Sequence, residues 1–298
     1  MKKTGFVSIS GQPNVGKSTL LNGLLGEKVA IISEKPETTR DTIRGILTRD
    51  DCQIIFMDTP GIHKPHDLLG RIMLTRARSS LLEADIILLL TEKRTALNRE
   101  DLNIISGLPR PKGGQTVLLI INKADRVKEK KTLLPLMDRA KQLYPFDEII
   151  PMCALDRSDL DMLLNIIKPY LKEGPFLYPE EQLTDKNEHF LVQEIIREKI
   201  LAETYEEIPH SVAVVVDKMK KKGTAGVIEI YATIFVERTS QKSIIIGKKG
   251  AMLKQIGKQA RLDIEKLLSG HVYLDLWVKV REKWKKDANA LEEIGYST

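Results

Sequence analysis

The stretch GQPNVGKS, Gly11 to Ser18, places the strongest limit on how this 298-residue chain folds. It matches the pattern G-x-x-x-x-G-K-[ST] at every fixed position. The strand-like segment GFVSIS precedes it and the helix-like segment KSTLLNGLL overlaps its end. A glycine loop between a strand and a helix points backbone amides and the helix N-terminus at one place, where an anion binds. The sequence therefore predicts a phosphate-binding loop in an α/β sheet.

Within this loop, Gly11 and Gly16 allow the backbone to wrap the β-phosphate of a nucleotide. Lys17 is expected to reach the β- and γ-phosphate oxygens, and the Ser18 hydroxyl to ligate Mg²⁺. The loop residues predicted to bind the nucleotide are Gly11, Gln12, Pro13, Asn14, Val15, Gly16, Lys17, Ser18 and Thr19.

Two further motifs indicate that the nucleotide is GTP. In NKAD, Asn122 to Asp125, the Asp125 carboxylate can accept hydrogen bonds from guanine N1–H and the exocyclic amine, which adenine cannot offer. In CAL, Cys153 to Leu155, the Ala154 amide is expected to contact guanine O6. The residues predicted here are Asn122, Lys123, Asp125, Cys153, Ala154 and Leu155.

Two switch segments are also predicted. In DTPG, Asp58 is expected to hold Mg²⁺ through water and the Gly61 amide to sense the γ-phosphate, with Thr59 and Pro60 beside them. In ETTRD, Glu37 to Asp41, Thr39 is the predicted second ligand of Mg²⁺, and Thr38 is the alternative. The predicted catalytic residues are Lys17, Thr39 and Gly61.

The residue after DTPG is Ile62, where Ras-type enzymes have a glutamine that orients the attacking water. Isoleucine has no polar atom for this task, so intrinsic hydrolysis should be slow. His63 and His66 follow in the same segment, and we interpret them as exposed switch residues rather than catalytic ones.

The first part of the chain alternates strand-like and helix-like segments. CQIIFMD, ADIILLLT and TVLLIINK are nearly continuous apolar runs, typical of parallel strands buried on both faces. Helices are expected over Leu133–Leu143 and Leu160–Leu171. We predict an α/β, doubly wound, mostly parallel sheet over residues 1–173, with ligands at the carboxyl ends of its strands.

The segment around KEGPFLYPEEQLTDK has two prolines and a glycine, and we place a linker at residues 174–186. The second domain, 187–298 with a C-terminal helix, has an α+β pattern of helix, two strands, short helix, GKKG, helix and strand. From Lys218 to Lys286 there are 17 Lys/Arg and 6 Asp/Glu, a net charge of +11 against +6 for the whole chain. This concentration of positive charge favours a nucleic acid as the partner.

GKKG, Gly247 to Gly250, is not a second phosphate loop, because it lacks the four-residue gap and the Lys-Ser/Thr pair. A G-x-x-G turn between helices, beside a three-stranded sheet, is the KH arrangement that clamps a single strand. The predicted RNA-binding residues are Ile246, Gly247, Lys248, Lys249, Gly250, Lys254, Lys258 and Arg261. In the C-terminal segment WVKVREKW, Trp277 should face outward from a strand and Trp284 should anchor the next helix, in preference to lipid insertion.

The two cysteines, Cys52 and Cys153, cannot form a disulfide framework, and no apolar run is long enough to span a bilayer. We see no signal peptide at the N-terminus, and we expect a cytoplasmic monomer. His and Cys residues show no close metal-ligand spacing.

In GQPNVGKSTLLN, PETTRD, DTPGIHKP, NKAD, IIIGKKGAMLKQIGKQAR and LWVKVREKW, nearly the whole chain resembles the Era family of bacterial ribosome-assembly GTPases. The resemblance implies a P-loop, Ras-like GTPase domain followed by a type II KH domain. It implies GTP hydrolysis, binding to the 3′ end of 16S ribosomal RNA, and a role in maturing the 30S subunit or its precursor. It also implies partly peripheral association with the cytoplasmic face of the membrane. Cys153 departs from the serine usual in the family, although a backbone amide makes the main contact there.

Related GTPases with an asparagine at the position of Asn14 use it to bind K⁺, so we expect K⁺ beside Mg²⁺ as a cofactor. An alternative function is a GTP-gated RNA-binding scaffold or growth-status sensor in which hydrolysis is incidental. A DNA-binding KH protein is a weaker third interpretation.

Overall fold

The structure is a computed structural model, and it describes residues 2–92, 96–109, 115–222 and 226–296. Two compact units make up the chain. The first runs to Asp185 without Ser33–Pro36 and Pro65–Ile72, and these two segments group with Lys186–Thr298 in the second. Among the described residues, no helix has the length and apolar character that a membrane span requires.

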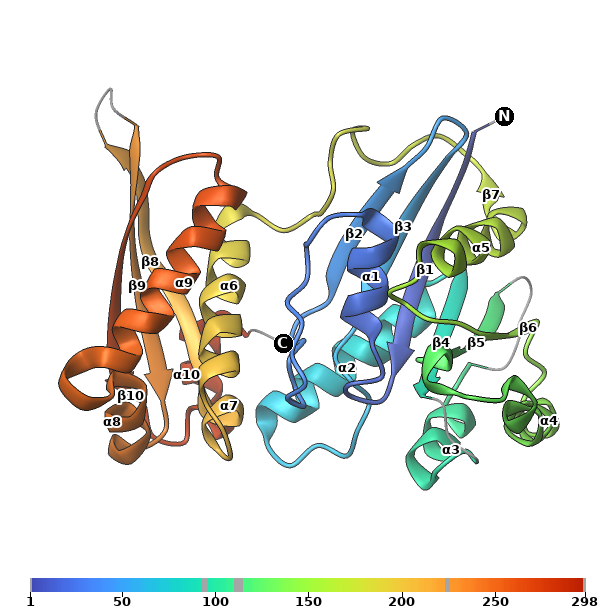
Figure 1. Cartoon of the computed structure of the whole chain (residues 1–298), viewed down its shortest axis with the longest axis horizontal. Helices are drawn as coiled ribbons and strands as arrows, with labels where there is room; N and C mark the ends of the chain where they lie inside the picture. The colour runs from blue at the N-terminus through green and yellow to red at the C-terminus, as the bar shows by residue number, and fades with distance from the viewer. Residues whose placement is uncertain (1, 93–95, 110–114, 223–225, 297–298) are drawn as a thin grey trace. The chain divides into compact units, whose positions relative to one another are not determined.

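The first unit contains a twisted, mostly parallel sheet with the strand order β2-β3-β1-β4-β5-β6 (Figure 1). β1 pairs in parallel with β3 and β4, and the parallel pairing continues through β5 to β6. β2 pairs antiparallel with β3, and the short β7 pairs antiparallel with β1. The strands are β1 (Lys3–Gly11), β2 (Ile43–Thr48), β3 (Cys52–Asp58), β4 (Ile86–Glu92), β5 (Thr116–Asn122), β6 (Glu148–Pro151) and β7 (Lys172–Glu173). The predicted fold class is confirmed.

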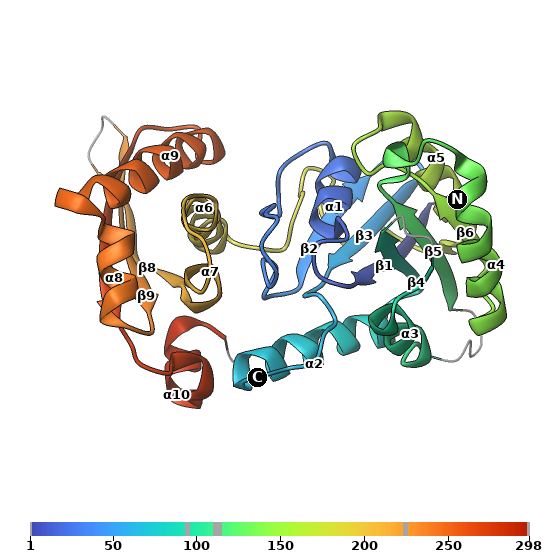
Figure 2. The ribbon, with the colours of Figure 1, turned by 60° about the horizontal axis from the view of Figure 1, so that its bottom comes forward.

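Helices cover both faces of this sheet, with α1 and α5 on one face and α2 and α3 on the other (Figure 2). Every residue of β3 and β5 is buried. Burial on both faces of the sheet explains why these strands are continuous apolar runs in the sequence. The helices and 3₁₀ turns are α1 (Lys17–Leu25), α2 (Leu68–Glu83), α3 (Arg99–Ser106), η1 (Ala124–Arg126), η2 (Lys130–Leu133), α4 (Leu134–Leu143), α5 (Arg157–Ile167) and η3 (Lys168–Tyr170).

The helix predicted over Leu160–Leu171 is displaced toward the N-terminus. It begins at Arg157 because the Asp156 side chain accepts hydrogen bonds from the amides of Ser158 and Asp159. It ends at Ile167, and a 3₁₀ turn that contains Pro169 follows.

The predicted linker, residues 174–186, packs along the first unit. The Gln53 side chain accepts from the Leu177 and Tyr178 amides at 2.7 and 3.0 Å.

The second unit has a three-stranded sheet in the order β10-β9-β8, in which β8 and β9 are antiparallel and β9 and β10 parallel. The core consists of one face of this sheet packed on α6 and α9, through residues such as Ile196, Ile234 and Ile256. The elements are α6 (Glu188–Glu203), α7 (Ile208–Ser211), β8 (Ala213–Lys222), β9 (Val227–Val236), α8 (Thr239–Ile246), η4 (Lys248–Gly250), α9 (Ala251–Leu267), β10 (Val272–Val280), η5 (Trp284–Lys286) and α10 (Ala288–Ile294). This is the predicted element order, except that the short helix α7 between α6 and β8 was not predicted.

The two tryptophans of the C-terminal segment have different environments. Trp277 on β10 is 60% exposed. Trp284 is fully buried, and its ring N–H donates to the Ser211 carbonyl at 3.0 Å. Trp284 therefore fixes the chain that leads into α10, as the sequence predicts.

Candidate nucleotide and nucleic-acid sites

The carboxyl ends of four parallel strands bring the predicted nucleotide motifs to one edge of the first sheet. β1 ends at Gly11, β3 at Asp58, β5 at Asn122 and β6 at Pro151. β1 has parallel neighbours on both sides, so the strand order reverses at the strand that leads into GQPNVGKS. Ligands of open α/β sheets bind at such a reversal.

The phosphate loop holds Lys17 in a buried position. Its Nζ donates to the Gln12 carbonyl at 2.8 Å and to the Gly11 carbonyl at 3.4 Å. Burial lowers the pKa of Lys17 to about 8, although the charge of Asp58 opposes that shift. The ammonium group lacks a charged hydrogen-bond partner in these contacts, and a phosphate would supply one.

Asp58, Ser18 and Thr39 converge on one point. Ser18 Oγ donates to Asp58 Oδ2 at 2.7 Å, and Thr39 Oγ1 donates to the same oxygen at 3.3 Å. The two hydroxyls lie 3.0 Å apart. The structure thus brings the Thr39 hydroxyl to the predicted metal position, so the switch segment closes over the loop.

This cluster fits Mg²⁺. Asp58 is fully buried, and its second oxygen, Oδ1, has no hydrogen-bond partner among the described residues. Burial raises the pKa of Asp58 to about 6, against the lowering effect of Lys17 and of the two hydroxyls. A buried carboxylate beside two hydroxyls is a set of hard oxygen donors, which Mg²⁺ prefers together with water and phosphate oxygens. The ion would hold the carboxylate in its charged form.

The guanine-side motifs are held together by Asn122. Its Nδ2 donates to the Val15 carbonyl at 2.8 Å, and its Oδ1 accepts from the Ala154 amide at 3.0 Å. Lys123 donates to the Asn14 carbonyl at 3.0 Å and pairs with Glu92. The Ala154 amide predicted to contact guanine O6 therefore bonds Asn122 in this structure.

Asp125 lies on the exposed turn η1 beside Cys153, which is half-buried. Burial raises the pKa of the Cys153 thiol, and the Asp125 carboxylate raises it further. The carboxylate is exposed, so a bound base would have to bury it for full discrimination against adenine. Leu155, predicted as a contact, is 80% exposed.

DTPG packs directly on the phosphate loop. A Cβ at Gly61 would lie 2.7 Å from Pro13 Cγ and 2.8 Å from Pro13 N, so only glycine fits. Thr59 was expected near the nucleotide, but its hydroxyl donates to the Ile9 carbonyl at 3.0 Å in the core. Only the backbone of Thr59 remains for nucleotide binding, because its hydroxyl is already hydrogen-bonded in the core.

The sequence did not indicate which residues hold the Gln12 side chain in place. Its Nε2 donates to Asn98 Oδ1 at 2.7 Å and to Asp101 Oδ1 at 2.5 Å. Asp101 also accepts from Thr91 Oγ1 at 3.2 Å. The capping box Asn98–Asp101 at the start of α3 is a sequence signal for the helix, although it does not indicate the contact with the loop.

The GKKG turn lies between α8 and α9, and both lysines are exposed. Gly247 has φ +72°, and a Cβ there would lie 2.7 Å from Met252 Cβ, so the tight turn requires glycine. Lys254, Lys258 and Arg261 are exposed on α9 at the spacing i, i+4, i+7, which places them on one face of the helix. Ile246, at the end of α8, is half-buried and packs against the core of the second unit.

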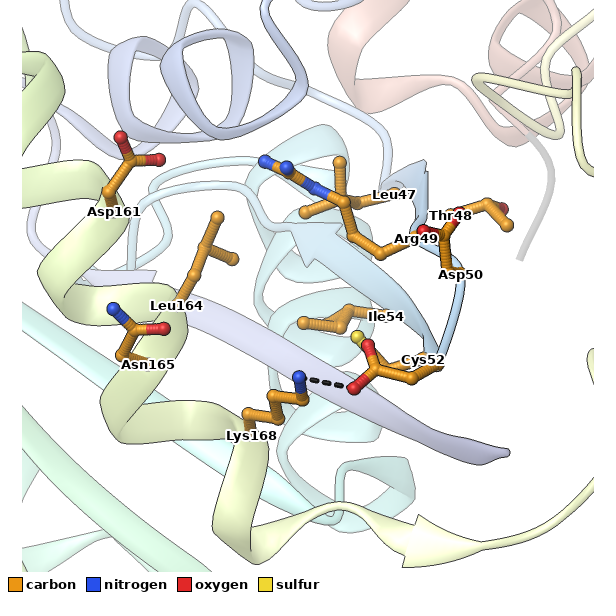
Figure 3. A pocket seen from close by; sticks show the side chains of 11 residues that line it. Leu47, Thr48, Arg49, Asp50, Cys52, Ile54, Asp161, Leu164, Asn165 and Lys168 are labelled. Carbon is orange, nitrogen blue, oxygen red and sulfur yellow. Dashed lines mark ion pairs between the residues drawn. The ribbon is translucent and has the colours of Figure 1, made fainter. Parts of the chain in front are cut away.

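A separate cavity of about 870 Å³ lies between the β2–β3 turn and α5 (Figure 3). Its lining includes the apolar residues Leu47, Ile54 and Leu164, and also Lys168 and Asp51, which form an ion pair. The cavity lies at the start of β3, whereas Asp58 lies at its end. None of the predicted nucleotide-binding residues lines it.

Comparisons with known proteins find relatives of both compact units. A family described as "50S ribosome-binding GTPase" matches residues 6–123, and a KH domain matches residues 207–285. A crystal structure of Era with MgGDPNP and nucleotides 1506–1542 of 16S ribosomal RNA is 43% identical, with a TM-score of 0.95 and 100% of both chains covered. A single-residue variant of Aquifex aeolicus Era bound to GDP·AlF4⁻ is also 43% identical, with a TM-score of 0.94 and 99% of this chain and 100% of that chain covered.

Proposed function

The chain belongs to the Era family of GTPases, and from that membership we propose that it is a GTP-hydrolysing switch for ribosome assembly. In this proposal it binds the 3′ end of 16S ribosomal RNA through GKKG and acts in maturation of the 30S subunit or its precursor. Full-length similarity to an Era that was solved with both MgGDPNP and this RNA supports the assignment.

The observation that carries the proposal is the closed cluster of Ser18, Thr39 and Asp58. A buried carboxylate oxygen without a partner, beside two hydroxyls and a buried lysine, is suited to a metal–phosphate group. With Mg²⁺ bound, the site would neutralise charge on the β- and γ-phosphate oxygens. Lys17 would donate to those oxygens, and the Gly61 amide would face the transferred phosphoryl group.

Hydrolysis needs an oriented water, and Ile62 offers no polar side-chain atom for it. In this proposal the backbone around Thr39 and Gly61 supplies the hydrogen bonds that orient the water. A slow intrinsic rate follows, because positioning and charge stabilisation account for nearly all the catalysis in phosphoryl transfer.

The experiment compares RNA release from three states of the purified chain. A fluorescent RNA that copies the 3′ end of 16S ribosomal RNA is bound with GTP, with GDP or with GMPPNP. A switch keeps RNA bound with GMPPNP and releases it after hydrolysis of GTP. Equal release from the GDP and GMPPNP states would favour the scaffold, in which hydrolysis is incidental. A single-stranded DNA of the same sequence tests the DNA-binding alternative, because RNA alone has the 2′-OH.

Potassium is a second part of the proposal, with Asn14 as its ligand. Asn14 is exposed in the phosphate loop with φ 64°, and its carbonyl already accepts from Lys123. Hydrolysis at equal ionic strength in KCl and NaCl, for wild type and Asn14→Ala, tests this. Faster hydrolysis in KCl that disappears in the variant supports the ligand, and equal rates in both salts exclude it.

Family resemblance also supports a cytoplasmic monomer with partly peripheral attachment to the membrane. Exposed Trp277 near basic residues of the C-terminal segment is compatible with an anionic surface. Co-sedimentation with vesicles of anionic and of neutral lipid, for wild type and Trp277→Ala, tests attachment. Absence of binding to both vesicles would remove the direct membrane contact.

A further inference from the structure

A short bridge connects the two switch segments of the first unit. His63 Nε2 lies 3.3 Å from Glu37 Oε1, and His63 Nδ1 lies 2.9 Å from the Gly61 carbonyl oxygen. The side chains are 18% and 26% exposed, so the bridge is largely sheltered from water. His63 is therefore not the exposed switch residue that the sequence suggests, whereas His66 is exposed.

The geometry favours the protonated form of the His63 ring. A carbonyl oxygen and an ionised carboxylate only accept hydrogen bonds, and a neutral imidazole has one N–H. With neutral His63, one ring nitrogen would direct its lone pair at an oxygen. Both contacts become hydrogen bonds only when the ring is an imidazolium.

The surroundings of the ring favour that charge. The hydrogen bond with Glu37 raises the pKa of His63 above its ordinary value, although partial burial opposes the rise. Glu100, in the first turn of α3, is a second negative charge that acts on the ring. A raised pKa means that the bridge is present at low pH and is lost as the pH rises through that pKa.

Each end of the bridge is at or near a predicted catalytic residue, Thr39 at one end and Gly61 at the other. Glu37 has φ 60° and lies two residues before Thr39, whose hydroxyl is 3.0 Å from Ser18. Gly61, at the other end, packs on Pro13 of the phosphate loop. Loss of the bridge would release both switch segments from one another.

We propose that protonated His63 is a positioning residue, which ties Glu37 of one switch segment to Gly61 of the other and holds the arrangement competent for hydrolysis. It does not touch the reacting atoms. This inference rests on the proposed GTPase function, and in it hydrolysis depends on the protonation of His63.

The test measures kcat for GTP between about pH 6 and about pH 9, in the range where histidine titrates. The proteins are wild type, His63→Gln, Glu37→Gln and the matched control His66→Gln. His63→Gln keeps a hydrogen-bond donor for Gly61 and cannot titrate. We expect the ratio of wild-type to His63→Gln kcat to fall about fivefold as pH rises, the size typical of a partly exposed ion pair. The control should follow wild type, and GDP affinity should stay the same in all four.

Glu37→Gln gives a readout that a purely structural role would not move. It keeps the shape of the side chain and removes its charge, so the inflection of the kcat profile should shift to lower pH. NMR titration of His63 in the protein with Mg²⁺ and GMPPNP should show the same shift. Two results would overturn the inference. One is a ratio of wild-type to His63→Gln kcat that stays constant with pH, and the other is a His63 titration that does not shift in Glu37→Gln. Absence of GTP hydrolysis at every pH would instead contradict the proposed function.

Discussion

Replacing Lys248 and Lys249 with alanine tests whether GKKG holds the RNA backbone. Both side chains are exposed on a tight turn, in which Gly247 brings the backbone close to Met252. Each lysine that neutralises a phosphate of a single strand contributes about 0.7 to the slope of log K against log salt. The double variant should therefore lose about 1.4 from the slope.

The difference between the two slopes predicts a salt-dependent difference in RNA affinity that can be measured. Between about 50 and about 200 mM salt, wild type should lose about sevenfold more affinity than the double variant. Fluorescence anisotropy with a labelled RNA copy of the 16S 3′ end, in a KCl series, measures both slopes. GTP affinity should not change, because the nucleotide loops lie in the other compact unit.

Lys266→Ala is the control for charge alone. Lys266 is exposed at the C-terminal end of α9, roughly 24 Å along the helix from GKKG. Its removal should leave the slope close to that of wild type. An unchanged slope in the double variant, or an equal loss in Lys266→Ala, would refute the placement of the RNA backbone at GKKG.

Four other predictions concern specificity, catalysis, thiol chemistry and stability. Asp125→Asn should favour xanthine over guanine nucleotides in competition binding, because the amide reverses the donor and acceptor that the base must match; retained guanine preference would contradict the assignment. Gly61→Ala should abolish GTP turnover and retain GDP binding, since its Cβ would meet Pro13 at 2.7 Å; normal turnover would show that the close approach is dispensable. The Cys153 thiol has a raised pKa, so its alkylation should be slow at neutral pH, speed up as pH rises and be blocked by GDP; equal labelling with and without GDP would place it outside the nucleotide site. Trp284→Ala should lower the free energy of unfolding by about 3–5 kcal/mol in urea denaturation, as for other buried aromatic deletions; a change within error would mean that α10 does not depend on it.

Local sequence was sufficient for the motifs and the fold class. GQPNVGKS lies between a strand and a helix, and the apolar runs of β3, β4 and β5 show which strands are buried on both faces. A parallel sheet then brings the ends of these strands to one edge, so the sequence predicted the guanine-nucleotide site without coordinates. The interpretation of GKKG as a KH turn likewise follows from its place between two helices. These features depend on neighbouring residues, whose spacing is visible in the chain.

Tertiary structure decided which way individual side chains turn. Thr59 belongs to a motif yet directs its hydroxyl into the core, and Gln12 reaches Asp101, 89 residues away in the sequence. His63 forms its bridge with Glu37 in a different switch segment. Spacing along the chain contains no information about such partners, because each contact depends on how distant segments pack. The free energy of burying a polar group without a hydrogen bond then selects the orientation, and this selection operates only in the folded chain.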